Sequence, residues 1–368
     1  NGLRPSRYTV TKDGFVIMSS EIGVVEVKPE NVESHGRLEP GKMFLVDMNA
    51  GRIIEDEEIK NKIVSKQPYK DWVGEHTLPL SQIPYTGNSC PIEITNYKTR
   101  LRVFGYTMED ISTVINPMAT KSKEALGSMG IDTPLAVLSD KPQLLYNYFK
   151  QLFAQVTNPP LDGIREEIIT DISLAIGGDR NIFDVVPEQA KKLRIQNPVI
   201  SNDDLDKIKN LEHKDFKSVV IPILYSISKG VNGLEKALDD VLVACEMAVF
   251  EGANIIILSD RGVDKDNAPI PALLACSYLH HSLNKKQKRS KFGIVLETAE
   301  PREPHHFATL FGYGASAINP YLVNEIIREQ VKTKVIKDID AEDAVKNFNK
   351  AIGKGILKIM NKIGISTL

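Results

Sequence analysis

Cysteine is scarce in this sequence, which contains three cysteines in 368 residues. Cys90, Cys245 and Cys276 are too widely separated for the ligand spacing of a zinc or iron–sulfur site. Cys245 and Cys276 fall in apolar helical patterns, which predicts that both are buried as small hydrophobic side chains. An odd number of cysteines without a disulfide framework is typical of a reducing compartment. We therefore expect no metal centre and no cluster in this chain.

Strong net charge and long apolar runs are also missing. The formal net charge is -2 and no basic stripe with interleaved aromatic residues is present, so no nucleic-acid partner is expected. The densest basic run, KKQKRSK at 285–291, is predicted to be a solvated loop. Because no uncharged apolar run reaches the length that spans a bilayer, no membrane partner is expected either. With 42% hydrophobic residues, the chain is long enough for two folded parts.

The first part of the sequence alternates in the manner of β-strands. Residues 1–55 contain the segments YTVTKDGFVIMSS, VVEV and KMFLVDMNAGRII, and the pairs Asp13-Gly14 and Ala50-Gly51 favour hairpin turns. This pattern predicts an antiparallel β segment. A charged helix is predicted over 55–69 with Pro68 at its end, and residues 69–98 are predicted to form an irregular connector.

The main domain is expected to begin near Thr99 with two helices. Thr107 and Asp110 have the spacing of a capping box, and the helix that they begin is predicted to stop before Asn116 and Pro117. A second helix is predicted over 142–153, because Leu144, Leu145, Tyr148, Phe149 and Leu152 fall on one helical face.

From Ser218 onward, strand and helix patterns alternate. Strands are predicted from Ser218 and over 254–258, 292–296 and 315–318, and helices over 233–250, 272–283, 305–310 and 338–360. The strands are almost continuously apolar, as strands covered on both faces require. Repeated β-α units predict an α/β fold with a parallel sheet and right-handed crossovers.

Polar residues follow two of these strands directly. Asp260 and Arg261 come after the strand that ends in NIIIL, and Glu297 ends the next strand. In parallel α/β folds this strand end commonly carries the chemistry, so the three residues could hold a carboxylate or phosphate substrate. The alternative is structural: Asp260 caps the following turn and Arg261 pairs locally. The pairs His280-His281 and His305-His306 invite a metal hypothesis, but adjacent helical residues point about 100° apart, which favours structural roles.

The stretch 128–167, SMGIDTPLAVLSDKPQLLYNYFKQLFAQVTNPPLDGIREE, resembles the central region of the glutamate synthase large subunit. The resemblance extends from NGLRPSRY at the start to GISTL at the end. It implies the end of a class II amidotransferase (glutaminase) domain over 1–68, the connector over 69–98, the central domain over 99–355, and a lead-in to an FMN-binding domain over 356–368. It also implies that the central sheet is an open, barrel-like parallel sheet with flanking helices.

The same resemblance implies a reaction for the parent enzyme. Glutamine is hydrolysed, ammonia passes internally to 2-oxoglutarate, and the product is reduced to a second glutamate with FMN and an iron–sulfur cluster. Electrons would come from a small NADPH-oxidising subunit or from ferredoxin, in the cytoplasm or in a plastid. The glutaminase nucleophile of the family is an N-terminal cysteine, which is absent here. We therefore expect this chain to bind neither cofactor, to be inactive by itself, and to expose apolar surface within 1–55.

Four polar residues are candidates for the wall of the ammonia passage, because they lie in apolar surroundings: Thr133, Gln155, Thr157 and Asn158. Buried polar side chains of this kind need partners. They either form packing turns or line the route of a small neutral molecule. The competing hypothesis for the whole chain is an independent α/β enzyme built on Asp260, Arg261 and Glu297.

Overall fold

The computed structural model describes residues 6–85, 87, 97–125, 135–150, 161 and 163–368. It divides into two compact units, Asn1–Glu75 and His76–Leu368. In the described residues, no helix is both long enough and apolar enough to cross a membrane.

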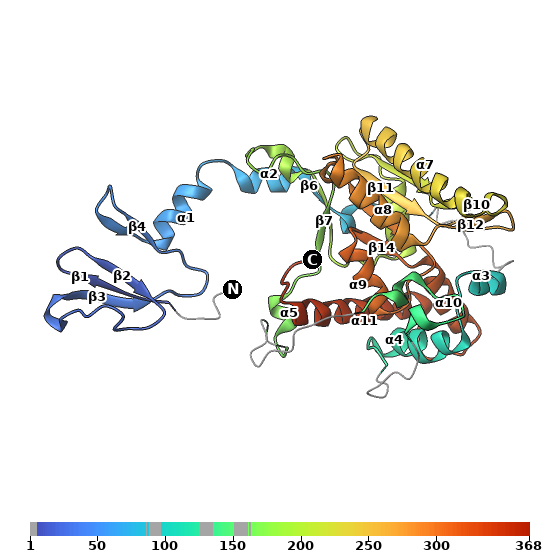
Figure 1. The fold of residues 1–368 in the computed structure, drawn as a ribbon, viewed down its shortest axis with the longest axis horizontal. Helices are drawn as coiled ribbons and strands as arrows, with labels where there is room; N and C mark the ends of the chain where they lie inside the picture. The colour runs from blue at the N-terminus through green and yellow to red at the C-terminus, as the bar shows by residue number, and fades with distance from the viewer. Residues whose placement is uncertain (1–5, 86, 88–96, 126–134, 151–160, 162) are drawn as a thin grey trace. The chain divides into compact units, whose positions relative to one another are not determined.

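The first unit contains an antiparallel β segment, as predicted (Figure 1). The segment VVEV at 24–27, which was predicted as a strand, is not one, and a strand forms at Val32–Arg37 instead. Strands β1 (Arg7–Thr11), β2 (Val16–Ser19) and β3 (Val32–Arg37) form a sheet in the order β2-β1-β3. Strands β4 (Leu45–Asp47) and β5 (Arg52–Ile54) form a separate hairpin. Gly14 and Gly51 occupy the two turns with positive φ, where glycine costs no steric strain. A 3-10 turn, Pro29–Asn31, precedes β3.

The charged helix predicted over 55–69 is confirmed, and a second helix follows it where an irregular connector was predicted. Helix α1 (Asp56–Val64) ends before Pro68, and α2 (Tyr69–His76) begins after it. The amide groups of Asp71 and Trp72 donate to the Pro68 carbonyl, so Pro68 belongs to the start of α2. Proline suits the first turn of a helix because its missing N–H has no intrahelical acceptor there.

The second unit is built on a four-stranded parallel sheet in the order β14-β13-β11-β9, which confirms the predicted α/β class. The strands are β9 (Ser218–Pro222), β11 (Ile255–Ser259), β13 (Gly293–Glu297) and β14 (Ala317–Asn319). The helices that connect or follow them are α7 (Gly230–Phe250), α8 (Ala272–Lys285), α9 (Pro304–Gly312), α10 (Tyr321–Lys332) and α11 (Ala341–Ile363). A short antiparallel pair, β10 (Leu224–Ser226) and β12 (Asn267–Pro269), lies beside α7. Two 3-10 turns, Ile227–Lys229 and Arg289–Lys291, complete this region.

Alternate side chains of the sheet enter different cores. Ile256, Leu258, Ile294 and Leu296 face the larger core, with α7, α8, α9 and α11. Ile255, Ile257 and Val295 face a smaller core on the other side. That side is covered by helix α6 (Asn202–Lys209) and by a second sheet of β6 (Thr77–Pro79), β8 (Lys192–Ile195) and β7 (Leu174–Ile176). Both faces of β11, β13 and β14 are therefore buried, as their apolar sequences require, whereas the edge strand β9 exposes Val220.

Three further regions differ from the sequence prediction. The stretch 69–98 contains α2, β6 and a 3-10 turn, Leu80–Gln82, in its described part. The helix begun by Thr107 does not stop before Pro117, because a π-helical segment (Asp110–Ile115) passes directly into α4 (Asn116–Lys121) with Pro117 in the first turn of α4. The capping box itself is confirmed, since the Thr107 amide donates to Asp110 Oδ2 at 2.8 Å and the Asp110 amide donates to Thr107 Oγ1 at 3.1 Å.

The helix predicted over 142–153 is wrong in its described part. Only a 3-10 turn, Leu145–Tyr148, forms there, between Leu144 and Phe149 in extended conformation. Tyr146 is completely buried and Tyr148 is half exposed, so the segment points Tyr146 inward instead of packing one helical face. The remaining short elements are α3 (Tyr97–Val103), α5 (Glu166–Ile169) and 3-10 turns at Ala136–Leu138 and Pro187–Ala190.

Candidate functional site

Glu297 is the centre of a polar network at the carboxyl ends of β11 and β13. Its side chain is only 1% exposed. Both carboxylate oxygens accept from Lys209 Nζ at 2.8 Å, and Oε2 also accepts from Ser259 Oγ at 2.7 Å. Arg261 Nε donates to Oε1. Burial opposes ionisation of Glu297, but the charges of Arg261 and Lys209 outweigh it and hold its pKa below the usual range.

Arg261 is held on three sides within this network. Besides its bond to Glu297, its guanidinium stacks 4.1 Å from the centre of the Tyr321 ring, and Nη1 lies 3.7 Å from Glu325 Oε1. Arg100 on α3 approaches Glu325 Oε2 at 3.6 Å. Burial raises the pKa of Glu325 to about 7, against the lowering effect of Arg261 and Arg100. The guanidinium of Arg261 thus pairs with carboxylates of the protein itself.

Asp260 has hydrogen-bond partners other than those of Arg261 and Glu297. It is fully buried, and its carboxylate accepts from Thr298 Oγ1 at 2.6 Å and from the Ala299 amide at 3.0 Å. Burial raises the pKa of Asp260 to about 6. The prediction that Asp260 caps the turn that follows it is therefore wrong, because its partners lie after β13. Arg261 pairs within the protein with Glu297, which lies 36 positions away at the end of β13.

Sequence reasoning missed a further buried carboxylate, Glu300. The Tyr146 hydroxyl donates to Glu300 Oε2 at 3.0 Å and the Ala272 amide donates to the same oxygen at 3.1 Å. Burial, with the nearby charge of Asp260, raises the pKa of Glu300 to about 7. The Tyr146 ring stacks on His306 with centroids 4.5 Å apart. The sequence signal was the polar run ETAEPRE directly after a buried strand.

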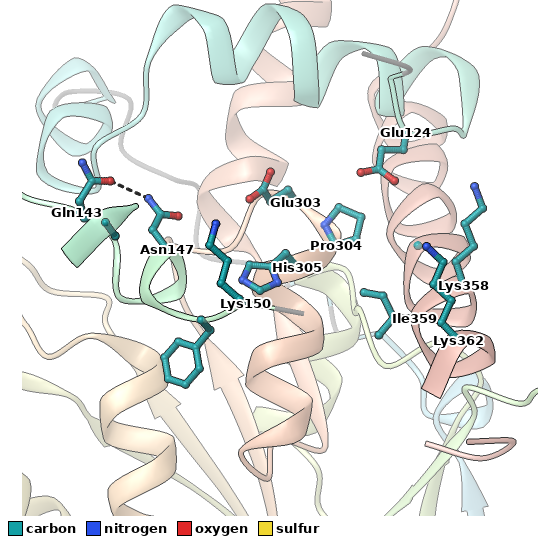
Figure 2. A pocket seen from close by; sticks show the side chains of 13 residues that line it. Glu124, Gln143, Asn147, Lys150, Glu303, Pro304, His305, Lys358, Ile359 and Lys362 are labelled. Atoms are coloured by element: carbon teal, nitrogen blue, oxygen red, sulfur yellow. Dashed lines mark hydrogen bonds between the residues drawn. The ribbon is translucent and has the colours of Figure 1, made fainter. Parts of the chain in front are cut away.

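A pocket of about 580 Å³ lies beside this buried cluster, between residues 143–150, the start of α9 and the second half of α11 (Figure 2). Charged and polar side chains line much of it: Lys150, Lys358, Lys362, Glu124, Glu303, His305, Gln143 and Asn147. At its base, Gly355 of α11 meets Pro304 of α9 so closely that an added Cβ would lie 2.5 Å from Pro304 Cγ. The adjacent histidines His305 and His306 have different partners. His305 contacts the Tyr146 carbonyl at 3.1 Å, and His306 contacts Glu303 at 3.1 Å.

The four candidates for an ammonia passage, Thr133, Gln155, Thr157 and Asn158, lie outside the described residues.

Two family models match the sequence. The model described as "Glutamate synthase central domain" matches residues 99–368, and that of "Glutamine amidotransferases class-II" matches residues 1–72. The chain belongs to the glutamate synthase central domain family. The resemblance seen in the sequence is thereby confirmed, including the amidotransferase segment at the start.

Relatives of the glutamate synthase family match the whole chain. The glutamate synthase (NADPH) large chain of Bacillus subtilis is 44% identical over 368 residues, which is 100% of this chain and 24% of that protein. Glutamate synthase (NADH) of Schizosaccharomyces pombe is 40% identical, and the match covers 100% of this chain and 18% of that protein. The chloroplastic ferredoxin-dependent glutamate synthase of Spinacia oleracea is 40% identical, and the match covers 100% of this chain and 23% of that protein. The chain thus spans about a quarter or less of these relatives.

The described residues of this glutamate synthase segment do not fit the cofactors that the family implies. Cys245 and Cys276 are buried, and burial raises the pKa of each thiol to about 12, whereas cluster ligands are thiolates. No group of three His, Cys, Asp or Glu side chains that could hold a metal occurs in the described part of the chain. At the strand ends, Arg261 and Lys209 already bind Glu297, so a flavin phosphate has no free cation there.

Proposed function

We propose that this chain is the central segment of a glutamate synthase large chain, where it joins domains and contributes no catalytic group. The observation that carries the proposal is the uninterrupted match, at 44% identity over the full 368 residues, to the large chain of Bacillus subtilis. The boundaries would be those that the sequence implies, with the end of the glutaminase domain at 1–68 and the central domain at 99–355. The glutaminase and FMN-binding domains would be its neighbours in the same polypeptide.

The enzyme as a whole would form two glutamates from glutamine and 2-oxoglutarate, with ammonia passed internally between two sites. FMN and the iron–sulfur cluster would supply the reduction from other segments. Relatives named for NADPH, NADH and ferredoxin match this chain at 44%, 40% and 40% identity. Because relatives that use three different electron donors match this chain about equally well, the segment would take no part in choosing the donor. The compartment would be cytoplasm or plastid.

The strand-end network supports a structural role for the second unit. In parallel α/β proteins this edge of the sheet is the usual place for a ligand. Here Glu297 collects donors from α6 and from the end of β11, and Glu300 collects donors from the 145–148 turn and α8. Because these donors satisfy Glu297 and Glu300, the two carboxylates hold the surrounding elements together at the sheet edge.

Apolar exposure in the first unit supports a neighbouring domain. Met48 is 85% exposed and Phe15 is 64% exposed, and further exposed apolar side chains of this unit are Met18, Ile22, Val24, Val25, Met43 and Leu45. Many exposed apolar side chains in one small unit support a contact face there. The rest of a glutaminase domain would cover it.

Two measurements test the proposal. The purified chain should release no glutamate from glutamine and should show no flavin absorbance band after gel filtration. A chimera of the Bacillus subtilis large chain, in which this chain replaces the matching segment, should form glutamate from glutamine and 2-oxoglutarate. Turnover by the chain alone that Arg261→Ala abolishes would refute the proposal and favour the independent enzyme built on Asp260, Arg261 and Glu297.

A further inference from the structure

The second half of α7 carries a row of apolar side chains on its exposed face (Figure 1). Val243, Met247 and Phe250 are 54%, 60% and 92% exposed. Because their spacing is i, i+4 and i+7, the three side chains lie on one side of the helix, over two turns or about 10 Å. Single exposed apolar side chains are common on protein surfaces, but a row of three along one helical face indicates a contact surface.

A small pocket adjoins the end of this apolar row. Phe250 forms part of its wall, together with Val249 of α7, Leu283 of α8 and Phe292, which precedes β13. The pocket volume is about 240 Å³, below the roughly 300–1,000 Å³ of small-molecule sites. A pocket of this size suits one apolar side chain inserted by a protein partner, as at the centre of many protein–protein interfaces. The pocket thus supplies an anchor point for such a partner.

Lysines cluster where α8 ends beside the pocket. Lys288 and Lys291 line the pocket, Lys285 is the last residue of α8, and Lys286 follows it. Glu246 pairs with both Lys286 and Lys288, with a nitrogen–oxygen distance of 2.7 Å in each pair, so one carboxylate faces two ammonium groups. Within the described part of the chain, the ammonium groups of Lys285 and Lys291 make no ion pair.

The charge beside the pocket stays positive when the helix ends are included. Helices α7 and α8 both end here, and the C-terminus of a helix carries about half a negative charge. Four lysines against Glu246 and two helix ends leave roughly two positive charges. Glu251, which follows α7, is offset by Lys217 at 3.9 Å. The surroundings of the pocket therefore favour carboxylates, whereas its interior favours an apolar side chain.

We propose that the apolar row and this pocket bind an amphipathic helix of a separate partner protein that carries acidic residues beside its apolar face. One large apolar side chain of the partner would enter the pocket, others would cover Met247 and Val243, and its carboxylates would meet Lys288 and Lys291. Helices that bind in this way present apolar residues at i, i+4 and i+7, the spacing of the row on α7. A second copy of this chain does not fit, because a two-fold contact through this face would bring the lysines of both copies together.

The test measures binding of two synthetic helices of about five turns to the 368-residue chain by fluorescence anisotropy. Both helices carry leucines and one central phenylalanine on the apolar face, and they differ only in having glutamates or lysines beside it. The acidic helix should bind to one saturable site, more weakly as salt is added, and the basic helix should not bind. Phe250→Ser and Met247→Ser should each weaken binding of the acidic helix by about tenfold or more, because a few apolar anchors carry most of the energy of such interfaces.

Two further variants separate the charges from the apolar row. Lys291→Gln should weaken binding of the acidic helix by about two- to fivefold, and by less at high salt, because exposed ion pairs contribute little. Val231→Ser is the matched control, since Val231 is 76% exposed at the other end of α7, and it should leave the affinity unchanged. Because Phe250 and Val231 are both exposed, thermal unfolding of the two serine variants should match that of the wild-type chain.

The inference fails if the acidic helix gives no saturable signal, if the basic helix binds equally well, or if Val231→Ser weakens binding as much as Phe250→Ser. It also fails if the acidic helix binds the 368-residue chain but not an active Bacillus subtilis chimera that carries this chain, because another domain of the same polypeptide would then cover the face. The measurements on the 368-residue chain do not depend on glutamate synthase chemistry, so the binding surface and the proposed function are tested separately.

Discussion

Lys209 Nζ lies 2.8 Å from both carboxylate oxygens of Glu297, although the two residues are 88 positions apart in the sequence. The contact joins the last turn of α6 to the end of β13. Glu297 also receives Arg261 and Ser259, so one buried carboxylate collects three donors, from α6 and from the end of β11. A buried charge without partners is costly, so the stability of this site depends on all of these donors together.

Glu297→Gln should destabilise the second unit strongly. The variant leaves Lys209 and Arg261 without their carboxylate, and breaking a buried ion pair in this way costs about 3–5 kcal/mol. Urea unfolding followed by circular dichroism measures the change in the free energy of unfolding. Lys346→Gln is the matched control, since its ion pair with Asp343 is exposed and contributes little to stability. Equal losses in the two variants would contradict a central role for Glu297.

Glu300 should make the stability of the chain fall as pH rises. Its pKa is raised to about 7 in the folded chain from an ordinary value of 4.5. Between these values the folded chain binds a proton that the unfolded chain has released, so the free energy of unfolding decreases with increasing pH. The shift corresponds to a stability change on the order of 3 kcal/mol. Asp260 and Glu325, raised to about 6 and 7, act in the same direction.

Glu300→Gln tests this dependence, because glutamine keeps an acceptor for Tyr146 and Ala272 but does not titrate. Urea unfolding of the variant at pH 5, 6, 7 and 8 should show a clearly smaller decline in stability than the wild-type chain. Glu235→Gln, on an exposed position of α7, should keep the wild-type slope. A variant slope as steep as that of the wild type would show that Glu300 does not titrate in this range.

Tyr146→Ala and Tyr148→Ala should differ sharply, although the two tyrosines are two residues apart. Tyr146 is fully buried, stacks on His306 and bonds to Glu300, whereas Tyr148 is 52% exposed. Removing the buried ring should cost about 3–5 kcal/mol. Removing the exposed ring should cost within roughly 0.5 kcal/mol. Thermal unfolding of both variants provides the measurement, and similar melting temperatures would mean that Tyr146 does not anchor the 145–148 turn.

The alternation of strands and helices after Ser218 was predictable because three of the four parallel strands, β11, β13 and β14, are buried on both faces. Runs such as the one at Ile255–Ser259 are apolar at every position, and helices of sufficient length separate them. Helix α10 was missed because its buried face includes polar residues, among them Asn324 and Glu325. These residues are buried near the strand-end network, and a search for apolar periodicity does not identify buried polar residues.

The site was predictable only in part, for a related reason. Asp260, Arg261 and Glu297 stand out because polar residues directly follow apolar strands. Their partners Lys209, Thr298 and Glu325 come from other elements, and nothing local in the sequence connects them. The helix predicted over 142–153 was wrong for the opposite reason. Its apolar residues have helical spacing, but Tyr146 instead contacts Glu300 and His306 in a non-helical segment. Tertiary contacts outweighed local propensity there.

Enlarging Thr133 or Thr157 tests the proposed ammonia passage in a glutamate synthase large chain that carries this segment. If either residue lines the passage, Thr133→Phe or Thr157→Phe should slow glutamine-dependent glutamate formation while glutamine hydrolysis continues, because the two sites would communicate only through that route. Activity with free ammonia, which enters elsewhere, should fall much less. A substitution that only overpacks the fold costs roughly 1–3 kcal/mol and lowers all three activities together. Measuring the three rates on one preparation separates these outcomes, and an equal loss of all three would assign Thr133 and Thr157 to packing turns.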